Sequence, residues 1–205
     1  MEWIWYFFLY SAAGFLIEVA YARLMGLKKR DRKCLLLLPL CPVYGVGALG
    51  ILLLPEPVLR APLLLVPAAA AVAVGAEYLM ALFYEKVWRV AFWDYRAMPF
   101  HLQGRVCLPF AAAWGLLALP LVYGVQPLAR RLAPLLPPEL LAGLTALFLA
   151  DCVCTGALLR RRGDTDALRW YRTVPLWLRA RAARRRSPPD APTRRPAGGQ
   201  RSESA

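Results

Sequence analysis

Long apolar blocks, separated by short polar segments, fill the chain up to Leu159. A membrane-spanning helix needs about 20 predominantly apolar residues, and each of these blocks is close to that length. The pattern therefore predicts an all-α fold, a polytopic membrane helix bundle of about five transmembrane helices. The expected spans are residues 3–25, 35–54, 62–84, 106–125 and 140–159.

The second block differs from the others because prolines and glycines interrupt its first half. Such residues make a poor straight helix, so two interpretations fit this block. It is either a broken span or a span whose start is a re-entrant stretch. In both cases its irregular backbone must be covered by protein or line a wet cavity. The residues concerned are Pro39, Pro42, Gly45, Gly47 and Gly50.

Residues 85–105, between the third and fourth blocks, mix aromatic and charged side chains. That mixture suits the headgroup region of a bilayer. We therefore expect an interfacial or re-entrant loop between the third and fourth spans.

Lysine and arginine gather in alternate segments between the blocks. Segments 28–33, 86–105 and 160–186 are rich in them, whereas the second polar segment holds only Arg60 and the fourth only Arg130 and Arg131. The positive-inside rule then predicts an N-terminus outside and a cytoplasmic C-terminus. No positive charge precedes the first block, which is also longer than a signal-peptide core, so we expect it to be an uncleaved helix.

The net charge of the chain changes the expectation of a membrane protein only slightly. A net charge of +13 would suit nucleic acid, but 59% of the residues are hydrophobic and the basic clusters flank apolar blocks. We therefore expect a lipid bilayer, including anionic lipids, as the partner, and no nucleic acid. The expected divisions are a transmembrane domain at 1–160, a basic juxtamembrane segment at 161–186 and a disordered tail at 187–205. Residues 169–186 also suit a short amphipathic helix on the membrane surface.

Three carboxylates fall inside apolar blocks, where each costs roughly 2.5–3.5 kcal/mol on insertion scales. They are Glu18, Glu77 and Asp151. Glu18 shares one helical stripe with Ser11 and Gly14, so it should face a neighbouring helix. A similar stripe in the third block contains Ala73, Glu77, Ala81 and Tyr84. We expect the three acids to converge near the cytoplasmic ends of their helices.

Two interpretations of these acids stay open. In the first, they line a polar cavity that handles a cation, a proton or a polar substrate group. In the second, they form structural ion pairs with Lys86, Arg96 or Arg105 from the loop. Asp94, His101 and Arg105 are further polar candidates in that loop, and we expect Arg105 to pair with Asp94 or Glu77. His101 is expected to make a hydrogen bond.

Signatures of common enzymes are absent from these residues. The sequence contains no G-x-x-x-x-G-K-[ST] loop, no G-x-S-x-G elbow and no H-E-x-x-H helix, so nothing supports an ATPase, a hydrolase or a metalloprotease. His101 is the single histidine, and the five cysteines follow no regular framework. We therefore expect no metal site and no cofactor.

Short motifs follow one another in an order typical of one family. They are YSAAGFLIE at 10–18, PLCPVYGVG at 39–47, Glu77-Tyr78, Trp93-Asp94-Tyr95, Pro99, GRVCL at 104–108 and Trp114-Gly115. Over residues 5–124 the chain resembles the putative ABC-transporter type IV family, the CmpB-like membrane proteins of bacteria. The motif residues carried over are Ser11, Gly14, Cys41, Pro42, Tyr44, Gly45, Trp93, Tyr95, Pro99, Gly104 and Cys107.

The chain departs from this family at four positions. Phe15 stands where the family usually has tryptophan, and Leu38 stands where it has glycine. His101 and Gln103 stand where the loop usually carries asparagine. The last two bear on any polar site in the loop.

The resemblance implies a permease-like component of a transporter in the bacterial inner membrane, with a separate ATP-binding subunit as partner. It names no substrate. Two other functions remain as alternatives: a membrane scaffold that recruits lipid or a protein partner, and an intramembrane enzyme that acts on lipid headgroups with Asp94, His101 and Arg105 at the interface. A homo-oligomer is compatible with all three.

The expected topology can be tested with a reporter that is active only in the cytoplasm. Fusions after Lys33, Arg96 or Arg162 should be active because these positions follow or lie within basic segments. Fusions after Pro57 or Pro134 should be inactive. Activity of the Pro57 fusion would contradict the five-span arrangement.

Overall fold

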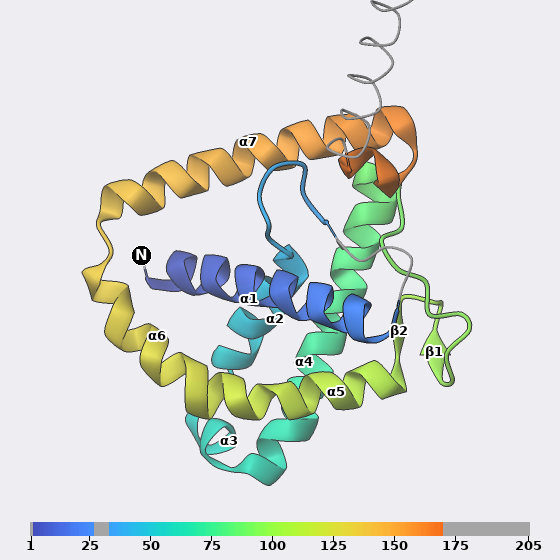
Figure 1. The fold of residues 1–205 in the computed structure, drawn as a ribbon. Coiled ribbons are helices and arrows are strands. Elements are labelled where there is room, and N and C mark those ends of the chain that lie inside the picture. The colour runs from blue at the N-terminus through green and yellow to red at the C-terminus, as the bar shows by residue number, and fades with distance from the viewer. Residues whose placement is uncertain (1, 27–32, 170–205) are drawn as a thin grey trace, which may run out of the picture. The chain divides into compact units, whose positions relative to one another are not determined.

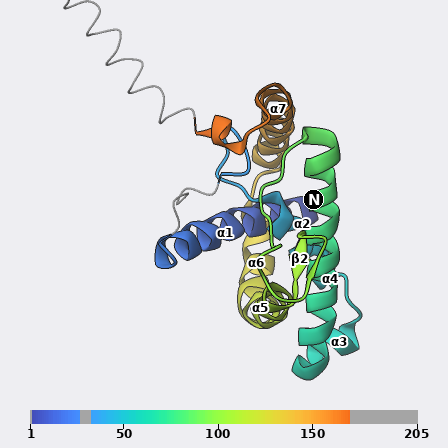
Figure 2. The ribbon, with the colours of Figure 1, turned by 90° about the vertical axis from the view of Figure 1, so that its right-hand side faces the viewer.

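The computed structural model describes residues 2–26 and 33–169, which are mostly helical (Figures 1 and 2). The amphipathic helix expected at 169–186 and the disordered tail expected at 187–205 lie outside the described residues, Arg169 excepted. The main helices are α1 (Glu2–Leu24), α2 (Pro42–Leu52), α3 (Glu56–Arg60), α4 (Pro62–Phe83), α5 (Leu108–Leu119), α6 (Gln126–Leu132) and α7 (Pro138–Arg162). Short helical turns, η1 (Tyr84–Trp88), η2 (Pro120–Val125), η3 (Ala133–Leu135) and η4 (Thr165–Leu168), and two strands, β1 (His101–Leu102) and β2 (Val106–Cys107), complete the fold.

Four helical runs in the described part of the chain are long and apolar enough to cross a membrane. They are Glu2–Leu24, Pro62–Trp88, Leu108–Leu135 and Pro138–Arg162, and they correspond to the first, third, fourth and fifth apolar blocks. The predicted helical membrane bundle is therefore confirmed. The fourth run extends ten residues beyond the predicted end, because η2, α6 and η3 continue it through Arg130 and Arg131.

The second block contains only an 11-residue helix, α2. The segment before it, residues 33–41, is not helical; it arches toward α7 and returns into α2 (Figure 1). The sulfur atoms of Cys34 and Cys41, near the two ends of this segment, lie 3.0 Å apart. The first half of the block therefore folds back on itself, which favours the re-entrant interpretation.

Asp151 of α7 holds the tip of this re-entrant segment. The backbone N–H groups of Leu36, Leu37 and Leu38 donate hydrogen bonds of 2.7–3.2 Å to its carboxylate oxygens. Leu36 N–H also donates to Thr155 Oγ1 at 2.9 Å. Asp151 is only 1% exposed, so its charge is compensated mainly by backbone dipoles of the segment.

Glycines allow α1 and α2 to approach each other closely. A Cβ atom on Gly14 would lie 2.1 Å from Cγ of Tyr44, and one on Gly45 would lie 2.3 Å from Oγ of Ser11. The N–H of Cys41 donates to the Ser11 carbonyl oxygen at 2.9 Å. Five residues of the motifs thus build one helix–helix contact, and its two glycines allow the close approach that small residues allow in membrane bundles.

Helix α4 buries one stripe of side chains against α5 and α2. The buried positions recur every fourth residue, so they lie along one face. Glu77 is part of this stripe, and the adjacent Tyr84 is also buried, as the helical spacing of Ala73, Glu77, Ala81 and Tyr84 predicted. The buried residues within α4 are Leu65, Ala69, Ala73, Glu77 and Ala81.

The helical run from α5 to α6 changes its hydrogen-bond pattern at Pro120. Proline has no N–H to donate to a carbonyl one turn earlier, and the residues that follow form the π-helical η2. At its end the Gln126 N–H donates to the carbonyl oxygen of Leu121, five residues back. This places the Gln126 side chain against α1, where it accepts a 2.6 Å hydrogen bond from the Tyr10 hydroxyl.

Replacement of Asp151 tests whether it holds the re-entrant segment. Asp151→Asn removes the charge and places a side-chain NH2 group, which is a hydrogen-bond donor, against backbone N–H donors. It should therefore lower the free energy of unfolding by about 1–3 kcal/mol. The measurement is the melting temperature of the purified protein in detergent. Glu139→Gln, which removes an exposed carboxylate from the same helix, is the matched control and should change little. Equal effects of the two substitutions would contradict the assignment.

Candidate functional site

A cavity of about 280 Å³ lies among α1, α2, α4, α5 and η2. Its wall is almost entirely apolar, with polar groups at a few positions. Because its lining comes from elements far apart in the sequence, it exists only in the folded chain. The lining residues are Tyr10, Ala13, Gly14, Ile17, Val43, Tyr44, Gly47, Ala48, Ile51, Ala73, Glu77, Trp114, Leu117, Ala118, Pro120, Leu121 and Val125.

Glu77 is the acidic residue in this wall, and it is only 4% exposed. Its Oε1 accepts a 2.8 Å hydrogen bond from the Tyr95 hydroxyl, and its Oε2 accepts a 3.3 Å bond from the indole N–H of Trp114. Burial, followed by the negative charge of Glu77, raises the pKa of the Tyr95 hydroxyl well above its ordinary value. Tyr95 therefore stays protonated and acts as a donor to the carboxylate.

Glu18 is connected to Glu77 through two aromatic residues. Its Oε1 accepts a 3.0 Å hydrogen bond from the Tyr44 hydroxyl. The rings of Tyr44 and Trp114 meet edge to face with centroids 4.7 Å apart, and Trp114 in turn contacts Glu77. The two carboxylates also lie close enough to interact electrostatically. The structure thus brings two of the three predicted acids near each other, with Glu77 in the cavity wall and Glu18 bound to the Tyr44 hydroxyl.

The third acid, Asp151, has different partners. It binds the backbone of residues 36–38 and the Thr155 hydroxyl, and it does not line the cavity. The expectation that all three acids converge is therefore wrong for Asp151. The reason is that the re-entrant segment presents three backbone donors, and sequence alone did not show where these would point.

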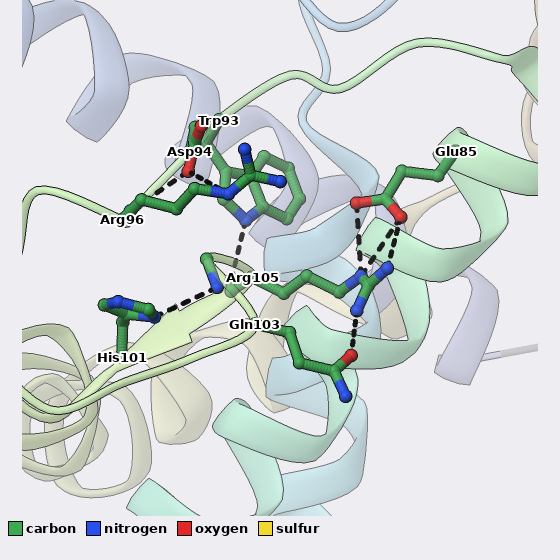
Figure 3. A network of polar contacts seen from close by, with 8 residues as sticks. Glu85, Trp93, Asp94, Arg96, His101, Gln103 and Arg105 are labelled. Atoms are coloured by element: carbon green, nitrogen blue, oxygen red, sulfur yellow. Dashed lines mark hydrogen bonds and ion pairs between the residues drawn. The ribbon is translucent and has the colours of Figure 1, made fainter.

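The loop between η1 and α5 is fastened by Arg105 (Figure 3). Its guanidinium forms an ion pair with Glu85 of η1, with Nη2 2.5 Å from Oε2, and also donates to Gln103 Oε1. The hydrogen bonds to Glu85 raise the pKa of the guanidinium, so it remains charged. Tyr78 donates to the same Gln103 oxygen at 2.9 Å, which joins the loop to α4.

The predicted partners of Arg105 are corrected by this geometry. Arg105 pairs with Glu85 rather than with Asp94 or Glu77, whereas Asp94 lies 3.8 Å from Nε of Arg96. In the described part of the chain, Glu77 and Asp151 form no ion pair with Lys86, Arg96 or Arg105. The loop nevertheless folds back onto the bundle, because Tyr95 reaches Glu77.

Gly104 sets the turn on which this loop depends. Its φ of +74° is the left-handed conformation that glycine adopts without strain. A Cβ atom there would also lie 2.8 Å from Oδ1 of Asp94. The Gly104 carbonyl accepts a 2.8 Å hydrogen bond from the Tyr95 N–H, and its own N–H donates to His101 Nδ1 at 3.3 Å. His101 therefore makes a local hydrogen bond to the turn.

The remaining motif residues lie at the starts of helices or in the loop, where they shape the path of the backbone. Cys41 precedes α2, where Pro42 is the first helical residue, and Cys107 precedes α5. Trp93 donates its indole N–H to the Arg105 carbonyl oxygen at 2.8 Å, which closes the loop from the other side. Pro99 is exposed in the turn before β1. The β1–β2 hairpin lies beside α4 and α5 (Figure 2).

Two functional partners were not predicted as such. Trp114 appeared only as a motif residue, although its indole N–H binds Glu77. Glu85 appeared only as the first residue of the loop, although it holds Arg105. Glu77 and Trp114 lie on neighbouring helices, and both face the cavity. Their spacing in the sequence could have indicated this pairing only if the packing of α4 on α5 had been known.

The chemistry available at the cavity is electrostatic and aromatic. Among residues 2–26 and 33–169, no group of three or more His, Cys, Asp or Glu side chains is arranged to hold a metal ion. What the site offers is a buried carboxylate, a second carboxylate nearby, two aromatic faces and apolar walls. Such groups bind and orient a ligand.

Comparison with known proteins gives one result. A family model described as Putative ABC-transporter type IV matches residues 5–156, which include every residue of the cavity and of the loop. No curated protein and no solved structure matches the chain.

A double-mutant cycle tests the Arg105–Glu85 pair. Arg105→Gln and Glu85→Gln should each lower the melting temperature in detergent, and the double variant should lose less than the sum, because a partly buried pair is worst when one charge is left alone. The matched cycle of Arg105→Gln with Asp94→Asn should be additive. Additive losses in the first cycle, or coupling in the second, would contradict the structure.

Proposed function

Because this chain belongs to the Putative ABC-transporter type IV family, we propose that it is the permease-like, membrane-embedded component of a transporter. It is a multi-pass membrane protein, with four helical runs in its described residues that are long and apolar enough to cross a bilayer. The 205 residues contain no P-loop, so the ATP-binding part of such a transporter lies outside them.

The observation that carries this proposal is the cavity with Glu77 in its wall. A carboxylate within an apolar span costs free energy, and such residues in membrane proteins commonly mark a substrate or ion pathway. Glu77 lies in α4, well inside the run Pro62–Trp88, and it lines the cavity.

The proposal includes an orientation in the bacterial inner membrane. The distribution of lysine and arginine favours an outside N-terminus and a cytoplasmic C-terminus, which requires that the second apolar block, with its short helix α2, also crosses the bilayer. In that orientation the loop fastened by Arg105 faces the cytoplasm, where an ATP-binding subunit would bind. The Tyr95 hydroxyl of the same loop binds Glu77 in the cavity wall, so the loop offers a connection between such a subunit and the cavity.

Purification from native membranes tests this function. We expect a protein that contains a P-loop to co-purify with the tagged chain in a fixed ratio, and the complex to hydrolyse ATP. Replacement of the P-loop lysine in that partner should abolish the hydrolysis, because this lysine binds the phosphates of ATP. An unrelated polytopic protein with the same tag serves as the control.

Absence of any ATP-hydrolysing partner would contradict the proposal. Recovery of envelope enzymes or lipid-modifying enzymes in its place would favour the scaffold alternative.

A further inference from the structure

The geometry of the cavity points to a class of ligand: we propose that it binds a monovalent organic cation with an apolar body. This inference rests on the proposed transport function and names the chemical class of its substrate. Three properties of the cavity favour such a ligand: its carboxylate, its aromatic faces and its apolar walls.

The acidic group in the cavity wall is the carboxylate of Glu77, which forms no ion pair within residues 2–26 and 33–169. An ionised carboxylate offers about four lone-pair positions, and Tyr95 and Trp114 occupy two of those on Glu77. Both partners donate a hydrogen bond, so the remaining lone pairs of the Glu77 carboxylate stay available to a cationic group. Within the described residues no lysine or arginine pairs with Glu77, and none lines the cavity. A cationic ligand would supply the missing charge.

Aromatic faces stand beside this carboxylate. Tyr44 and Trp114 both line the cavity, and their rings pack against each other edge to face. Tryptophan has the most favourable ring for binding a cation, and quaternary ammonium groups are commonly held between such rings. The Tyr44 hydroxyl donates a hydrogen bond to the second carboxylate, Glu18, which fixes this ring beside the cavity.

The rest of the wall is small and apolar. Ala13, Gly47, Ala48, Ala73 and Ala118 leave room for a hydrocarbon body, and the volume of about 280 Å³ suits a ligand of small size. An anion would meet the carboxylate without a counter-charge. A strongly polar neutral molecule would leave most of its hydrogen-bonding groups without partners, which is unfavourable in an apolar site.

The probe for this inference is radiolabelled benzyltrimethylammonium, which joins a fixed positive charge to an apolar ring. Equilibrium binding is measured on the purified full-length protein in detergent. Benzylsulfonate, an anion with the same ring, is the competitor that should not displace the label. Saturable binding of the cation to the wild-type protein is expected.

Two substitutions locate the binding. Glu77→Gln removes the charge and should weaken binding by about tenfold or more, as expected for the loss of a close opposite charge at low dielectric. Gly47→Leu introduces a side chain into the cavity without changing any charged group, because nothing lies within 4 Å of a Cβ atom at Gly47. It should weaken binding to a similar extent.

Gly75→Leu is the matched control. Gly75 also has nothing within 4 Å of an added Cβ atom, but it is exposed on α4 and does not line the cavity. Its binding should equal that of the wild-type protein. If Glu77→Gln does not fold, as judged by its melting curve, Gly47→Leu and the anionic competitor still decide the question.

The outcomes separate this inference from the transport function. Absence of saturable cation binding, equal competition by benzylsulfonate, or wild-type binding by Gly47→Leu would overturn the cation site. Co-purification of an ATP-hydrolysing subunit would in that case leave the transport function standing. Cation binding by a chain that has no such partner would support the site and contradict the transporter.

Discussion

The fold depends on one requirement of an apolar environment, which is that every backbone N–H group needs an acceptor. The chain turns back within its second apolar block, so the N–H groups of Leu36, Leu37 and Leu38 have no helical acceptors. Asp151 supplies them from α7, because a carboxylate accepts several hydrogen bonds at once. The position of the re-entrant segment determines where α2 begins, and α2 forms one wall of the cavity.

The loop before α5 is the second determinant of the cavity. The Tyr95 hydroxyl reaches Glu77 only because the loop folds against α4, and three features hold the loop in this position. Gly104 allows the turn, Arg105 ties it to Glu85, and Trp93 closes it on the Arg105 carbonyl. Loop geometry and the hydrogen bonding of a buried carboxylate are therefore coupled in one structure.

The sequence predicted those features that depend on local pattern. The apolar blocks located four long helical runs, and the spacing of Ala73, Glu77 and Ala81 identified the buried face of α4. Prolines and glycines predicted that the first half of the second block is irregular, but only Pro39 lies in the non-helical segment, and the other four lie within α2. Partners distant in sequence were not predictable, because nothing local distinguishes Glu85 from Asp94 as the acid for Arg105. Likewise, Asp151 was recognised as buried, but its backbone donors lie more than a hundred residues away.

The π-helical segment η2 has a consequence for the permitted length of this region. Successive residues of an α-helix are rotated by about 100°, so one residue more or fewer reorients everything that follows. A π-helical segment accommodates such an added residue within a continuous helix. The hydrogen bond between Tyr10 and Gln126 depends on the number of residues in this segment, because that number sets the direction in which the Gln126 side chain points. Here an insertion or deletion of a single residue would be more disruptive than most substitutions, and homologues that keep this contact should keep the number of residues between Pro120 and Gln126.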